Sequence, residues 1–292
     1  MDLKITFWGV RGSKPSPGKH TTAFGGNTSC VQIQAGSRNL IFDGGTGIAE
    51  LGHRMIEEGA TEADIFFSHL HWDHIHGLPF FHPFFRSGNR FRLYGLQGKD
   101  YSLESALKGQ MKPPYFPISM DNMKSSMEFI HLDPSSEIDL GEGLRIRMFE
   151  VDHPNTCLSF RVECGNSAAV YCTDTETLKG LQRDDFIKFI KGADALIYDS
   201  HFTEAEYEAI PPDENGRKWG HSTWEEGTKL AAEGGVGYLF LFHHKDSRRD
   251  EDQTRIEQSA KQLFRNTLAA REGMAVEIGG DYPEKVVLDY PR

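Results

Sequence analysis

The stretch His69-Leu70-His71-Trp72-Asp73-His74 places four side chains of metal-ligating type within six residues. It follows Ile65–Phe67, an apolar run that predicts a buried strand. Imidazole binds zinc and other borderline divalent ions, and a carboxylate adds negative charge and a harder oxygen ligand. A lone histidine is more simply explained as a core or surface residue. Three histidines and an aspartate on one loop instead predict a metal site.

Three further candidate ligands each come directly after a predicted strand. His153 follows Leu144–Val151, Asp174 follows Ala169–Cys172, and His243 follows Tyr238–Phe242. One loop cannot fill two coordination spheres, so ligands from other strand ends are needed. Because side chains gathered at one edge of a sheet form one site, we expect these residues to join the loop.

Short strand-like runs alternate with helical stretches in both halves of the chain. The other predicted strands are Lys4–Val10, Cys30–Gln34, Leu40–Phe42, Phe91–Tyr94, Leu158–Val162, Ala195–Tyr198, Ala275–Ile278 and Val286–Leu288. Helical spacing covers Thr46–Glu58, Leu181–Ile190, Thr223–Ala232 and Asp252–Arg271. No linker or repeat divides the chain. We therefore expect one α/β domain over residues 1–292, with two sheets packed face to face and helices outside.

The segment Lys99–Ser126 is the least regular part of the sequence. Its prolines at 113, 114 and 117 exclude a helix interior or a central strand around them. We expect an ordered loop, with either a substrate-side or dimer-side role or plain surface packing.

Composition limits the classes of partner. The 292 residues carry a net charge of −11, which disfavours a large nucleic acid as the main partner. The four cysteines have no C-x-x-C spacing, which indicates free thiols in a reducing compartment. The N-terminus has no signal-peptide pattern, and the apolar runs are too short to cross a bilayer. A soluble, cytoplasmic protein without a membrane partner is expected.

The pattern His69-x-His71-x-Asp73-His74, followed by His153, Asp174 and His243, resembles the complete ligand set of the metallo-β-lactamase superfamily, in its ribonuclease Z-like phosphodiesterase branch. The resemblance covers almost the whole chain, from Gly9-Val10-Arg11-Gly12-Ser13 to His243. It implies the αββα sandwich of that family and two divalent metal ions, Zn²⁺ first and Mn²⁺ as the alternative. By this resemblance, His69, His71 and His153 hold one ion, Asp73, His74 and His243 hold the other, and Asp174 bridges them. The neighbouring His76 and His244 are expected to support the ligands.

The segment Trp219-Gly220-His221-Ser222-Thr223 resembles the Gly-His-Ser/Thr motif of the ribonuclease Z relatives. The resemblance implies that His221 acts as general acid or transition-state stabiliser, with Asp73 as the other catalytic residue. Ser222 is the expected N-cap of the following helix. The alternative is a histidine of the capping turn with no chemical role.

Two segments near the N-terminus have less specific patterns. Asp43-Gly44-Gly45-Thr46-Gly47 lacks the lysine of a phosphate-binding loop and resembles the family's Asp-Gly-Gly turn, in which Asp43 supports the metal loop. For Arg11 and Asn27, contact with a phosphate and ordinary turn chemistry are both open.

Ribonuclease Z enzymes carry a tRNA-binding arm between the ligands that correspond to His153 and Asp174. Here these residues are only 21 positions apart, which leaves no room for that arm. The chain is therefore more similar to anti-Pycsar-type enzymes, which implies a small phosphodiester substrate, most simply a 3′,5′-cyclic nucleotide, and a homodimer. Tyr115 and Phe116 are candidate contacts for the base.

Three alternatives stay open. The first is a phosphodiesterase that opens a cyclic ribose phosphate, like the accessory enzyme of carbon–phosphorus lyase. The second is a ribonuclease Z-like RNA endonuclease. The third is an inactive scaffold with the same fold, although such proteins usually lose ligands and none of the expected ligands is missing here.

Overall fold

The computed structural model describes residues 2–214, 216–279 and 285–287. Within them the strands form two sheets, one of eight strands in the order β15-β14-β1-β2-β3-β4-β5-β6 and one of seven in the order β13-β12-β11-β10-β9-β8-β7. The strands of the first sheet are β1 Leu3–Gly9, β2 Cys30–Ala35, β3 Arg38–Phe42, β4 Glu62–Phe66, β5 Arg90–Gly95, β6 Ser126–His131, β14 Ala275–Ile278 and β15 Lys285–Val287. Those of the second are β7 Glu137–Gly141, β8 Leu144–Val151, β9 Cys157–Cys164, β10 Ser167–Cys172, β11 Ala195–Asp199, β12 Tyr238–Phe242 and β13 Thr267–Ala269.

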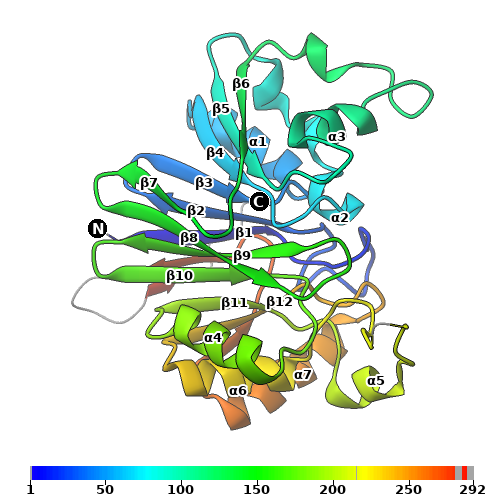
Figure 1. The fold of residues 1–292 in the computed structure, drawn as a ribbon, viewed down its shortest axis with the longest axis vertical. Helices are drawn as coiled ribbons and strands as arrows, with labels where there is room; N and C mark the ends of the chain where they lie inside the picture. The colour runs from blue at the N-terminus through cyan, green and yellow to red at the C-terminus, as the bar shows by residue number, and fades with distance from the viewer. Residues whose placement is uncertain (1, 215, 280–284, 288–292) are drawn as a thin grey trace.

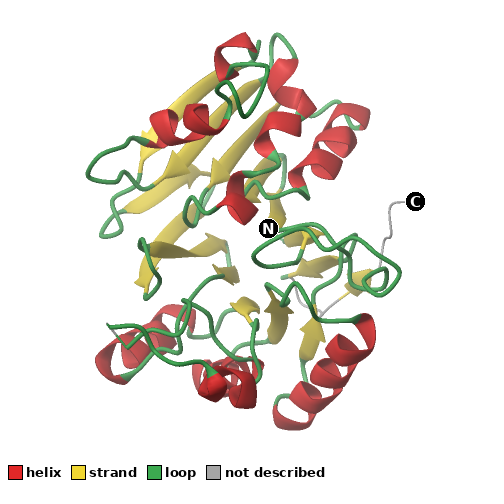
Figure 2. Ribbon diagram, turned by 90° about the vertical axis from the view of Figure 1, so that its right-hand side faces the viewer, coloured by secondary structure: helices red, strands yellow, loops and turns green. Residues whose placement is uncertain are grey.

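Helices cover the outer faces of the two sheets (Figures 1 and 2). The helices are α1 Ile48–Glu57, α2 Trp72–Ile75, α3 Leu103–Gln110, α4 Gly180–Ile190, α5 Glu204–Ala209, α6 Trp224–Gly234 and α7 Asp250–Leu263, with short 3₁₀ turns η1 Leu78–Phe80, η2 His82–Phe85 and η3 Met120–Asn122. The apolar residues of α1 pack on the first sheet, and those of α4, α6 and α7 pack on the second. The predicted αββα sandwich is thus confirmed. No helix among the described residues is long and apolar enough to span a membrane.

The central strands of the second sheet are buried on both faces. Every residue of β10 and β11 is buried, and β10, β11 and β12 run parallel. A strand covered by the other sheet on one side and helices on the other needs apolar residues throughout, which explains the uninterrupted runs in the sequence.

An aromatic layer joins the two sheets. Phe160 of β9 lies with its ring centroid 5.5 Å from Phe42 and 5.7 Å from Phe66, both in the first sheet. Phe66 in turn stacks on Tyr94 at 4.4 Å. These four side chains are all within the buried cluster between the sheets.

Three expectations about local structure were wrong. The helix predicted for Asp252–Arg271 ends at Leu263, and residues 267–269 form β13 because they pair with β12. Lys99–Ser126 is not simply a loop, since α3 forms within it and begins at a capping box of Ser102 and Ser105.

The third wrong expectation concerns the start of α6. Thr223, not Ser222, is its N-cap, because the Thr223 hydroxyl accepts from Glu226 N at 3.1 Å. The last predicted strand is found at residues 285–287, and Leu288 lies outside the described residues.

Replacing Phe160 with alanine should lower the free energy of unfolding by about 3–5 kcal/mol, because the change leaves a cavity between the sheets. Denaturant unfolding measures this. Phe80→Ala is the control, since that side chain is 53% exposed, and it should cost less than about 1 kcal/mol. Equal losses in the two variants would contradict the assigned core.

Candidate metal centre

The carboxyl ends of several strands meet at one edge of the sandwich. His69 and His71 follow β4, Asp174 follows β10 and His243 follows β12. His153 follows β8, which points the same way as β10 because each is antiparallel to β9. The strand directions therefore bring all the sequence-predicted ligands to one place, from both sheets.

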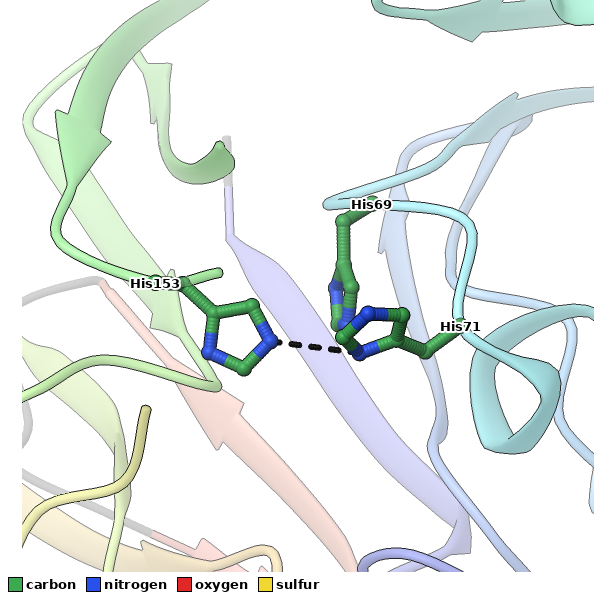
Figure 3. A group of neighbouring side chains, drawn as sticks. All are labelled: His69, His71 and His153. Carbon is green, nitrogen blue, oxygen red and sulfur yellow. Dashed lines mark hydrogen bonds between the residues drawn. The ribbon is translucent and has the colours of Figure 1, made fainter. Parts of the chain in front are cut away.

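His69, His71 and His153 form the first group of candidate ligands (Figure 3). His153 Nε2 lies 3.2 Å from His71 Nδ1, and the rings of His69 and His71 have centroids 4.4 Å apart. Burial lowers the pKa of His69 well below its usual value and that of His153 to about 4. Both rings are therefore neutral near pH 7, which is the form that binds a metal.

Asp73, His74, Asp174 and His243 form the second group. Asp174 Oδ2 lies 3.1 Å from His74 Nε2 and 3.2 Å from His243 Nε2, while its Oδ1 lies 3.9 Å from His69 Nε2. Asp73 Oδ2 lies 3.2 Å from His243 Nε2. Asp174 is thus the carboxylate that contacts both groups.

The residues fit divalent metal ions on two counts. His69 Nε2 and His74 Nε2 are buried without a hydrogen-bond partner, although both face the Asp174 carboxylate. Burial opposes a charge on His74, yet the carboxylates of Asp73, Asp174 and Asp43 raise its pKa well above the usual value. The site therefore attracts positive charge and offers unused imidazole nitrogens. Mixed nitrogen and oxygen donors of this kind suit Zn²⁺ or Mn²⁺.

Asp43 contacts both ends of the loop Ser68–His74, which we call the metal loop, as the Asp-Gly-Gly turn led us to expect. Its carboxylate accepts from Ser68 N at 2.8 Å, Ser68 Oγ at 2.7 Å and the Tyr171 hydroxyl at 2.7 Å. It also lies 2.7 Å from His74 Nδ1. A carboxylate on the outer nitrogen of a histidine fixes the ring and directs Nε2 toward the metal position.

His221 lies against the two groups and is held by Asp199, a residue that the sequence analysis missed. His221 Nδ1 is 2.9 Å from Asp199 Oδ2 and 3.7 Å from Asp174 Oδ1. Burial disfavours the charged ring, but the neighbouring Asp199 carboxylate raises the pKa of His221 to about 9. Asp199 ends β11, so the strand-end rule that found His153 could also have found it.

Glu176 is a second missed residue, and it fixes the segment that carries His221. Its buried carboxylate accepts from Gly220 N at 2.8 Å and from the Tyr207 hydroxyl at 2.7 Å. The Gly220 carbonyl lies 2.8 Å from His153 Nδ1. A Cβ on Gly220 would lie only 2.2 Å from that nitrogen, so glycine is required for the approach.

The two open residues near the N-terminus have structural partners. Arg11 is fully buried and donates to the carbonyls of Gly25 at 2.7 Å and Arg248 at 2.8 Å. Asn27 Nδ2 donates to Glu272 at 3.2 Å. These contacts support the interpretation as turn chemistry.

Three other histidines near the ligands differ in position. His244 Nε2 lies 2.8 Å from the Ala270 carbonyl, and His76 is an exposed ring beside Trp72, so their expected support of the ligands was wrong. His201, which the sequence analysis did not consider, stacks on His221 at 4.3 Å between ring centroids. Its Nδ1 lies 3.2 Å from the His243 carbonyl. His201 therefore packs on the ring of His221 and contacts the backbone of His243.

Residues 38–244 match the family model of the β-lactamase superfamily domain. A ribonuclease Z from Gemmatimonas aurantiaca is 24% identical over 329 aligned positions, which cover 95% of this chain and 96% of the relative. The metallo-β-lactamase fold protein YhfI from Bacillus subtilis superposes with a TM-score of 0.70 at 22% identity, over 95% of this chain and 99% of YhfI. A diphosphatase of the PhnP family gives 0.66 at 19% identity, over 95% and 98% of the two chains. These structural likenesses establish a common fold.

Asp43→Asn should weaken metal binding by about 10- to 100-fold, because the amide cannot accept all the contacts that orient His74 and Ser68. Competition with a chelator, followed by metal analysis, measures the change. Asp64→Asn is the control, since this buried carboxylate pairs with Arg92 instead. Unchanged metal affinity in folded Asp43→Asn protein would argue against this support.

Proposed function

The chain belongs to the β-lactamase superfamily, and from that premise we propose that it is a phosphodiesterase that uses two divalent metal ions to hydrolyse 3′,5′-cyclic nucleotides. The observation that carries the proposal is the pair Asp199–His221 beside the two ligand groups. Phosphodiester hydrolysis needs a proton donor at the leaving oxygen and positive charge at the non-bridging oxygens. This pair supplies the proton donor, and the ligand groups beside it supply the site for positive charge.

When bound, the two ions supply Lewis acidity toward the phosphoryl group and activate the attacking water. We assign His69, His71 and His153 to one ion and Asp73, His74 and His243 to the other, with Asp174 shared. The protein holds these side chains with partners on their outer nitrogens, Asp43 for His74 and the Gly220 carbonyl for His153. The ligands therefore need little reorganisation when substrate binds.

We propose that His221 protonates the departing ribose oxygen. Because Asp199 occupies Nδ1, the Nε2 nitrogen is the one available to the substrate. The Asp199 carboxylate on Nδ1 raises the pKa of His221 and so favours the protonated ring that a proton donor needs. Asp73, which contacts His74 and His243, completes the catalytic residues that we propose.

A small substrate is supported by the connection between His153 and Asp174. Strands β9 and β10 form an antiparallel hairpin that takes up nearly all of this interval. No inserted element extends from the sheet there to hold a long RNA. The net charge of −11 also disfavours a polyanion.

We also propose a homodimer, as the resemblance to small-substrate relatives implies. Trp72 is 75% exposed, so its ring is available for contact with a second chain. Light scattering should give the molar mass of two chains, and the mass of one chain at micromolar concentration would contradict the dimer.

A substrate panel tests the proposed function. Metal-loaded protein should open 3′,5′-cyclic nucleotides faster than a cyclic ribose phosphate, bis(p-nitrophenyl) phosphate or a short RNA. The RNA arm is informative because one of the relatives is a ribonuclease Z. Intact cyclic nucleotides together with efficient cleavage of another arm would contradict the proposal.

Two variants should separate metal binding from proton transfer. Asp174→Ala should lose bound metal and activity together, because this carboxylate contacts both ligand groups. His221→Ala should keep its metal and lose about 10²- to 10⁴-fold in kcat. Metal analysis and initial rates on the same preparations check both. Wild-type turnover in His221→Ala would remove this residue from the mechanism.

A further inference from the structure

We propose that the cavity beside His69 and His71 binds the uncharged planar ring of the substrate, which is the base of a cyclic nucleotide. This inference rests on the proposed function and names the part of the substrate that the metal ligands do not hold. The ring cavity, as we call it, has a volume of about 320 Å³, within the range of small-molecule sites. Leu70, Leu96, Tyr101 and Asn155 line it together with the two histidines.

The lining of the ring cavity matches an uncharged ligand. None of its residues is Asp, Glu, Lys or Arg. Burying a charged group there would cost solvation without a counter-ion, whereas a flat ring gains contact with Leu70 and Leu96. Because His69 and His71 form its metal-side wall, a phosphate held at the ions leaves the attached ring next to the cavity.

Tyr101 provides an aromatic surface in this cavity. Its side chain is 41% exposed, so part of the ring is open to a ligand. The loop between β5 and α3 turns back on itself, and Gly98 N donates to the Tyr101 carbonyl at 3.1 Å. A Cβ on Gly98 would lie 2.2 Å from Tyr101 Cε1, so glycine lets the ring lie flat against the loop. An aromatic side chain can stack on any of the bases, because each base has a flat π-face.

Asn155 connects the ring cavity to the metal centre. Its amide lies 3.1 Å from His71 Nε2, the nitrogen opposite the one that faces His153. Asn155 and Thr156 both have left-handed backbone, with φ of 78° and 52°. Such backbone is rare at a β-branched residue like Thr156 and is found often at functional sites. The amide has further donor and acceptor capacity for the edge of a base.

The aromatic residues expected from the sequence to contact the base lie elsewhere. Tyr115 and Phe116 do not line the ring cavity. Phe116 packs against Phe80 with ring centroids 5.7 Å apart. Tyr115 is therefore a matched control for Tyr101, because it is a tyrosine of the same segment, residues 99–126, that lies outside the cavity.

Equilibrium binding of adenosine to the metal-loaded protein tests the inference, because adenosine carries the ring without a phosphate and is not hydrolysed. Wild type should bind adenosine saturably and ribose not at all. Tyr101→Ala should weaken adenosine binding about tenfold, in keeping with the loss of one stacking contact. The affinity of Tyr101→Phe and of Tyr115→Ala for adenosine should each stay within about twofold of wild type, because both variants keep an aromatic ring at position 101.

Steady-state kinetics then separate this inference from the proposed function. Tyr101→Ala should raise KM for a cyclic nucleotide about tenfold and leave the kinetics of a base-free cyclic ribose phosphate unchanged. Adenosine binding that depends on Tyr101, in a protein that cleaves no phosphodiester, would overturn the proposed function and keep the ring cavity. Cleavage of cyclic nucleotides with no effect of Tyr101→Ala, or with equal losses in Tyr101→Ala and Tyr115→Ala, would overturn the ring cavity and keep the function. Thermal unfolding confirms that each variant is folded.

Discussion

The contact of one buried carboxylate with two sets of imidazoles is the feature on which the rest of the site depends. Asp174 lies within 3.9 Å of His69 and within 3.2 Å of His74 and His243. A carboxylate and unpaired imidazole nitrogens removed from water are costly unless a cation joins them. Three neighbouring carboxylates hold this arrangement. Asp43 contacts His74, and Asp199 contacts His221. Glu176 accepts from Gly220, whose carbonyl contacts His153.

The site also concentrates backbone strain. Within the part of the chain that the structure describes, the non-glycine residues with positive φ are Ser13, Asp43, Glu142, Asn155, Thr156, Asp174, Trp219 and His243. All except Glu142 lie in loops around the candidate metal centre. Each such conformation costs about 1–3 kcal/mol and persists only where surrounding structure enforces it. The two-sheet core supplies that enforcement at Asp43, Asp174 and His243, because each of them follows the end of a buried strand. These conformations lower the stability of the fold, and in return they direct individual side chains into the site.

The sequence predicted the sandwich and brought the seven candidate ligands together because both depend on short-range patterns. Apolar runs mark the strands, and polar residues after them mark the shared edge. What it missed depends on tertiary contact. Residues 267–269 were predicted as part of a helix, but they pair with β12. Asp199 ends a strand in the same way that Asp174 follows one, and it is the contact with His221 that gives Asp199 its place in the site. Tyr101 could not be separated from Tyr115 without the fold of the β5–α3 loop.

A metal titration of the metal-free protein tests the central claim most directly. Zn²⁺ or Mn²⁺ is added in steps, and bound metal and hydrolysis of a cyclic nucleotide are followed together. Two ligand groups that both lie against Asp174 predict two ions per chain, with full activity reached only when the second ion is bound. Full activity at one ion per chain, or activity that persists after all metal has been removed, would contradict a two-metal phosphodiesterase.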